Sequence, residues 1–167
     1  MNKSPYWYIA LFVYAVLVQV LIMNHLQFSG FVNPYFYILF ILILPINFPR
    51  YLLLILGFVL GITVDVFSNT PGIHASSTVF MAFLRPYVIN TSNVDEQDRM
   101  MIPSVANIGF GWFIRYALIL ITFHHLFLFF VEIFTAKGFL NTLLRSFSSA
   151  IFTFVFILVN QFLIFRK

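Results

Sequence analysis

The stretch GFVLGITVDVFSNTPGIHASS, residues 57–77, places an aspartate inside an otherwise apolar part of the chain. Gly57, Gly61 and Asp65 recur at every fourth position, which puts them along one stripe of a helix. Glycines at this spacing let the backbone of a second helix approach closely, and the carboxylate that continues the stripe then points at protein rather than lipid. The stripe predicts packing on a neighbouring helix or a docked partner. The alternative is a common glycine pattern followed by an aspartate that only marks a helix end.

The composition indicates an integral membrane protein. Of the 167 residues, 62% are hydrophobic and 8% are charged, whereas soluble domains carry about 25% charged residues. We expect one membrane domain over residues 1–167. The sequence contains no cysteine, which excludes disulfides, thiolate metal sites and cysteine nucleophiles.

Long apolar runs separated by polar breaks predict an all-α protein with six transmembrane helices. The expected spans lie near residues 6–26, 31–47, 51–67, 73–89, 108–133 and 139–165. The second is short, because a helix that begins at Pro34 covers only about 20 Å at 1.5 Å per residue. We expect it to begin earlier or to be shielded by its neighbours.

The placement of basic residues predicts that both termini lie in the cytoplasm, since cytoplasmic loops collect Lys and Arg. With the N-terminus inside, Lys3, Arg50, Arg85, Arg99, Arg115, Arg166 and Lys167 fall on or near the cytoplasmic side, and Lys137 and Arg145 fall outside. The longest polar segment, residues 90–107, is then a cytoplasmic loop and the most obvious contact point for soluble partners.

The sixth expected span offers Asp65 a charged partner. Asn141, Arg145, Ser148 and Ser149 form a polar stripe on its outer half, which is also the half where Asp65 is expected. An ionised carboxylate below the lipid headgroups must be paired or wetted. We therefore predict an ion pair between Asp65 and Arg145. The alternative is that Arg145 reaches the outer surface and Asp65 is bound by backbone groups or water.

Two further polar positions lie in the fourth and fifth expected spans. His74 and Arg85 share one face of span four, where each is a candidate contact for a partner or for lipid headgroups, and headgroup contact is favoured for Arg85. His124 and His125 lie near the middle of span five and point about 100° apart, which argues against a shared metal site. One histidine bonded inside the bundle is expected, and a proton relay is the alternative.

The sequence holds no recognisable catalytic set: it lacks a nucleophile elbow, a zinc-binding helix pattern and a phosphate-cradling glycine loop. We expect no enzymatic activity, no cofactor and no metal site.

Several features together resemble the bacterial rod shape-determining MreD family. These are six short spans in a chain of this length, the motif GFVLGITVD at 57–65, the break SNTPG at 68–72 and the RP pair at 85–86. The resemblance is specific over residues 57–86 and compositional elsewhere. It implies a fold similar to the six-helix substrate-binding subunits of energy-coupling-factor transporters, with an outward-opening pocket.

The resemblance also implies a function and its partners. The expected protein is a non-enzymatic scaffold of the cell-elongation (rod) complex in the bacterial inner membrane, which binds MreC and lipids. Through MreC it is linked to MreB, RodA and a class B penicillin-binding transpeptidase, and it helps to maintain cell shape and position peptidoglycan synthesis. The expected helix-packing or docking residues are Gly57, Gly61, Asp65, Gly72, Arg145, Ser148 and Ser149.

Two other functions are alternatives to the scaffold. A substrate-binding subunit of a vitamin-like transporter needs a roomy pocket with several convergent polar groups, and the short outer loops offer few. An ion or proton channel needs a continuous polar path, and the inner halves of spans three and six are almost wholly apolar until Asn160. The scaffold is therefore the favoured interpretation.

Overall fold

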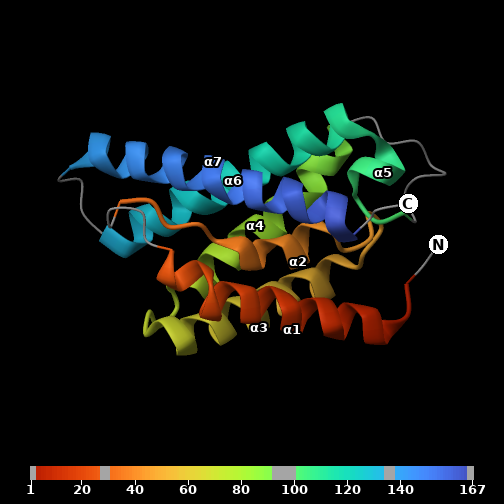
Figure 1. Ribbon diagram of the computed structural model, residues 1–167, viewed down its shortest axis with the longest axis horizontal. Helices are drawn as coiled ribbons and strands as arrows, with labels where there is room; N and C mark the ends of the chain where they lie inside the picture. The colour runs from red at the N-terminus through yellow and green to blue at the C-terminus, as the bar shows by residue number, and fades with distance from the viewer. Residues whose placement is uncertain (1–2, 27–30, 92–100, 134–137, 165–167) are drawn as a thin grey trace.

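The computed structural model describes residues 3–26, 31–91, 101–133 and 138–164, and in these residues it confirms an all-helical chain. The long helices are α1 (Pro5–Leu21), α3 (Arg50–Ser68), α4 (Ile73–Asn90), α6 (Phe110–Ile133) and α7 (Phe139–Ile164). The short elements are η1 (Met23–His25), η2 (Phe36–Ile38), α2 (Leu39–Leu42) and α5 (Val105–Ile108). The start of α1 and the end of α7 lie at the same end of the bundle (Figure 1). We call this the terminal end, and the opposite end, where α3 turns into α4, the hairpin end.

Four helical segments in the described part of the chain are long and apolar enough to cross a membrane. They are Pro5–His25, Arg50–Ser68, Phe110–Ile133 and Phe139–Ile164. The fourth expected span corresponds to α4, an 18-residue helix that is less apolar on average than these four and is not among them. The structure therefore shows an apolar helical bundle of the kind found in membranes.

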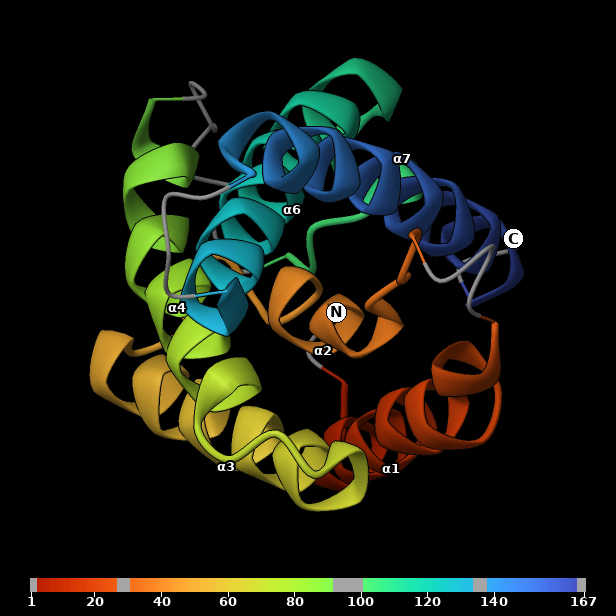
Figure 2. The same cartoon turned by 90° about the vertical axis from the view of Figure 1, so that its left-hand side faces the viewer.

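The second expected span, residues 31–47, is not a membrane-crossing helix. Its helical content is limited to the three residues of η2 and the four of α2. Every residue from Phe36 to Leu44 is at most 2% exposed, and α2 lies at the centre of the bundle with α1, α3, α4, α6 and α7 around it (Figure 2). The expectation that neighbours shield this segment is thus confirmed. A segment enclosed by protein does not have to cover the full membrane thickness, and apolar composition alone does not reveal this.

We call the buried residues 36–44 the central segment. Arg85 of α4 binds its end, at Leu44, and the adjoining Pro45. Its guanidinium donates to the carbonyl oxygens of Leu44 and Pro45, the latter at 3.2 Å, and its Nε donates to Tyr116 Oη at 2.7 Å. Tyr116 in turn donates to Leu42 O at 2.9 Å. Irregular backbone at membrane depth is tolerated when its polar groups find partners within the protein. Arg85 is 1% exposed, so the expected contact with lipid headgroups is wrong.

Helices α3 and α4 pack closely through the glycine stripe. A Cβ atom added at Gly61 would lie 2.6 Å from the backbone nitrogen of Ala75 and 2.6 Å from the carbonyl oxygen of His74. A Cβ added at Gly57 would lie 3.2 Å from the Cβ of Ala82. The stripe therefore packs on a neighbouring helix of the bundle, which is the first of its two expected roles.

We predict that Gly61→Ala destabilises the protein by about 1–3 kcal/mol, because the added methyl group meets backbone atoms that move only if the helices separate. Gly57→Ala is expected to cost less, since a side chain is its nearest neighbour. Gly111→Ala is the control, because a Cβ there meets nothing within 4 Å. Denaturant titration in detergent micelles measures all three. Equal stabilities of the Gly61 and Gly111 variants would contradict the packing.

We also predict that Arg85→Lys destabilises the fold by about 2–3 kcal/mol, because an ammonium group lacks the planar fork that serves several acceptors at once. The control is Arg115→Lys, since Arg115 is exposed and bonds the Gly111 carbonyl of its own helix. Its stability is expected to change by no more than about 0.5 kcal/mol. Equal melting temperatures for the two variants would show that the guanidinium is not needed.

Candidate functional site

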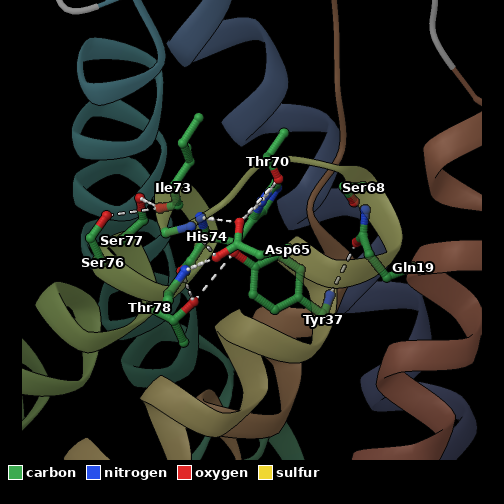
Figure 3. A network of polar contacts seen from close by, with 12 residues as sticks. Gln19, Tyr37, Asp65, Ser68, Thr70, Ile73, His74, Ser76, Ser77 and Thr78 are labelled. Carbon is green, nitrogen blue, oxygen red and sulfur yellow. Dashed lines mark hydrogen bonds and ion pairs between the residues drawn. The ribbon is translucent and has the colours of Figure 1, made fainter.

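Asp65 caps the first turn of α4 from the neighbouring helix α3. Its Oδ2 accepts hydrogen bonds from the backbone N–H groups of Gly72 (3.1 Å) and Ala75 (3.0 Å). Its Oδ1 accepts from the His74 backbone N–H and the Thr70 hydroxyl, each at 3.0 Å (Figure 3). His74 Nδ1 lies 3.0 Å from the same oxygen. The first N–H groups of a helix lack intrahelical partners and form its positive end, so a carboxylate is well placed there.

The predicted ion pair between Asp65 and Arg145 is wrong. Both carboxylate oxygens of Asp65 are engaged by residues 70–75. Arg145 instead lies 3.4 Å from Glu132 through its Nη1, and its guanidinium stacks 4.5 Å from the ring centre of Phe129. The alternative is confirmed for Asp65, which backbone groups bind, but not for Arg145, which pairs with Glu132. The turn that follows α3 supplies donors closer along the chain than any charged residue on another helix.

The turn between α3 and α4 depends on two residues with positive φ. Asn69 ends α3 with φ of 55°, and Gly72 precedes α4 with φ of 84°. A Cβ at Gly72 would meet nothing within 4 Å. Glycine is thus required there by backbone conformation, not by the helix packing that the sequence suggested.

A polar core continues from α4 into the centre of the bundle. Thr78 donates to the carbonyl oxygen of His74 at 2.7 Å and lies 3.3 Å from Tyr37 Oη. Tyr37 Oη lies 2.9 Å from His124 Nε2, while His125 Nε2 lies 2.9 Å from Thr153 Oγ1. The two adjacent histidines are both buried and face different neighbours, the central segment and α7, as their angular separation predicts. Among the described residues, no group of three or more potential ligands is arranged to hold a metal ion.

A cavity of about 450 Å³ lies at the hairpin end of the bundle. It is lined mainly by polar side chains, which include Gln19, Asn24, Asn33, Ser68, Glu132 and Arg145. Thr70 and His74 reach the same cavity from beside the Asp65 cap. Such a set of amides, hydroxyls and one ion pair can bind a polar ligand through hydrogen bonds.

The residues predicted from the sequence thus belong to two separate places. Gly57, Gly61 and Asp65 lie in the α3–α4 contact, whereas Arg145 lies at the cavity. Ser149 is buried, and its hydroxyl accepts from the Asn33 backbone N–H at 3.0 Å, which positions a cavity residue. Ser148 is half-buried on α7.

Sequence reasoning did not identify Gln19, Asn24, Asn33 or Glu132 as site residues. The available signal was Gln19, an amide within the first apolar run. Because hydropathy averages over such single residues, it did not stand out.

Comparison of the chain with protein-family models, with curated proteins and with solved structures finds no match. A functional conclusion therefore has to come from the residues and their geometry.

We predict that Asp65→Ala destabilises the protein by at least about 3 kcal/mol, because three backbone donors lose their acceptor and two of them, those of His74 and Ala75, are buried. Asp65→Asn is expected to fall between Asp65→Ala and the unchanged protein, since it keeps one acceptor oxygen. The control is Ser76→Ala, which removes a hydroxyl that bonds the Ile73 carbonyl within α4. Denaturant titration in micelles is the measurement.

The same experiment separates the cap from an ion pair. Combining Asp65→Arg with Arg145→Asp is expected to give no recovery over Asp65→Arg alone. Recovery in the double variant would restore the ion-pair interpretation.

Proposed function

We propose that this protein is a non-enzymatic scaffold subunit of the bacterial cell-elongation (rod) complex. It resides in the inner membrane as a multi-pass protein with both termini in the cytoplasm. It binds MreC and, through MreC, contributes to the placement of MreB, RodA and a class B penicillin-binding transpeptidase. In this role it helps to maintain cell shape and to position peptidoglycan synthesis.

The observation that carries this proposal is the use of the Asp65 carboxylate as a helix cap. Residues 57–86, which bear the resemblance to the MreD family, act together as one structural unit: a close helix contact, a capped turn and the buried Arg85. The carboxylate of Asp65 and the guanidinium of Arg85 are both engaged in holding parts of the bundle together. Such a unit supports a rigid platform for partners better than a reaction centre.

The distribution of charge at the two ends supports the proposed orientation. Lys3, Arg50 and Arg115 are exposed at or near the terminal end, whereas Arg145 at the hairpin end is paired with Glu132. An excess of basic residues on one side is typical of the cytoplasmic face. The hairpin end and its cavity then face the cell exterior or periplasm.

The cavity favours a second candidate function, a substrate-binding subunit of a small-molecule transporter. Its volume of about 450 Å³ lies within the range of ligand pockets, and its lining is polar. From the sequence, the short outer loops offer few polar groups for such a pocket, whereas the structure lines it with polar side chains from the helices and the segments that join them. The scaffold remains the preferred function because the resemblance rests on the α3–α4 unit, which lies beside the cavity and mainly holds the bundle together.

We predict that the tagged protein, extracted in mild detergent, co-purifies with a protein that has one transmembrane helix and a large external domain, as expected for MreC. Mass spectrometry identifies the co-purified chains. An unrelated multi-pass membrane protein with the same tag is the control. Recovery of an ATPase module and a bound vitamin instead would overturn the scaffold in favour of the transporter subunit.

Depletion in the native cell gives a second readout. The scaffold function predicts rounded cells at unchanged nutrient supply. A growth defect that an added small nutrient cures, in cells that stay rod-shaped, would contradict it.

A further inference from the structure

The cavity lies at the hairpin end of the bundle, where the apolar helices end, and residues from all sides of the bundle line it. Its lining residues come from the ends of α1 and α3, the starts of α4 and α7, the end of α6 and the chain that leads into the central segment. The apolar spans end here, and headgroups lie where apolar spans end. Pro34 and Tyr35, which also line the cavity, immediately precede the central segment, so the cavity continues the bundle axis beyond it.

The cavity carries one positive and one negative charge. Arg145 Nη1 and Glu132 Oε2 lie 3.4 Å apart, and their side chains are 21% and 35% exposed. Arg145 Nε is buried and makes no hydrogen bond with the described residues. Asn33 lies on the other side of the guanidinium, with its amide oxygen 2.8 Å from Nη2 in the orientation that satisfies both groups. The guanidinium is thus held in place and retains capacity to donate.

A chain of neutral polar groups forms the wall nearest α1 and α3. Gln19 Nε2 donates to Asn24 Oδ1 at 2.9 Å, and Asn24 Nδ2 donates to Ser68 Oγ at 3.1 Å. Two further hydrogen bonds fix Gln19: its Nε2 donates to Pro34 O, and its Oε1 accepts from the Tyr37 N–H. These contacts fix the amides before a ligand arrives, which limits the entropy lost on binding.

We propose that this cavity binds a small zwitterionic group that combines an oxyanion with a primary ammonium, such as phosphoethanolamine. The oxyanion would bind Arg145, and the ammonium would bind Glu132. A lone anion would take Arg145 from Glu132 and leave the carboxylate without a partner, whereas a zwitterion supplies a partner to each. The group has two sources, the headgroup of phosphatidylethanolamine in the membrane and a free water-soluble compound. Such binding goes beyond the scaffold function and does not depend on it.

The test measures selectivity as well as affinity. The purified protein in detergent is incubated with equal amounts of phosphatidylethanolamine and phosphatidylglycerol, and native mass spectrometry counts the bound lipids. Calorimetry measures binding of free O-phosphoethanolamine, inorganic phosphate and ethanolamine. Arg145→Gln, Glu132→Gln and the control Arg115→Gln are compared with the unchanged protein, and each must be monodisperse with unaltered helicity.

The unchanged protein and Arg115→Gln are expected to prefer phosphatidylethanolamine or O-phosphoethanolamine over the ligands with a single charge. Arg145→Gln is expected to weaken that binding about tenfold or more, as loss of a charge-assisted hydrogen bond does. Glu132→Gln keeps the cation and is expected to bind phosphatidylglycerol or phosphate as well as the zwitterion. This loss of selectivity is a result that a purely structural role of Glu132 would not produce.

The lipid measurement and the soluble-ligand measurement together distinguish the two sources of the ligand. Binding of the lipid alone assigns the site to a membrane headgroup, and binding of the free compound alone assigns it to a soluble ligand; both results support the zwitterion site. The proposal is overturned if neither binds, if the unchanged protein binds single-charge ligands equally well, or if the Arg145 and Glu132 variants behave like Arg115→Gln. If Arg145→Gln does not fold, the selectivity of Glu132→Gln decides.

Discussion

The structure depends on the hydrogen bonds that join the Asp65 carboxylate to the start of α4. A charged side chain within a membrane-spanning bundle is costly unless protein groups replace the water that it loses. Here the backbone N–H groups of Gly72, His74 and Ala75 and the hydroxyl of Thr70 do so, at 3.0–3.1 Å. The same donors would be unsatisfied without the carboxylate. The same hydrogen bonds therefore satisfy the carboxylate near the end of α3 and the free N–H groups at the start of α4.

The cap sets the geometry of the rest of the bundle. Because it fixes the turn between α3 and α4, the two helices run back along each other, with Gly61 against the backbone of Ala75. Further along α4, Arg85 then faces the carbonyl oxygens at the end of the central segment. The central segment occupies the bundle axis towards the terminal end, and a polar cavity lies beyond it at the hairpin end. A bundle built in this way exposes many large apolar side chains on its exterior and keeps these polar groups inside.

The sequence predicted the helical class, the long apolar helices and the glycine stripe, because these depend on local pattern and composition. It also indicated that the short second span needs shielding by its neighbours. The predictions from the sequence were wrong for charged side chains whose partners are backbone groups. Arg85 was assigned to headgroups and Asp65 to Arg145 because a sequence displays charged side chains, whereas free N–H and carbonyl groups at helix ends become visible only once the chain has folded. An outward-opening pocket was expected from the resemblance, but its polar lining was missed for a related reason, since the polar residues are scattered singly over apolar runs.

The most direct test of the Asp65 cap is hydrogen exchange at the backbone amides of Gly72, His74 and Ala75 in micelles. Amides in the first turn of a helix exchange quickly unless an acceptor outside the helix holds them. The account predicts slow exchange at these three amides in the unchanged protein and fast exchange in Asp65→Ala, which has no acceptor, with α1 unaffected. Fast exchange at these amides in the unchanged protein would contradict the cap, and with it the structural basis of the proposed scaffold.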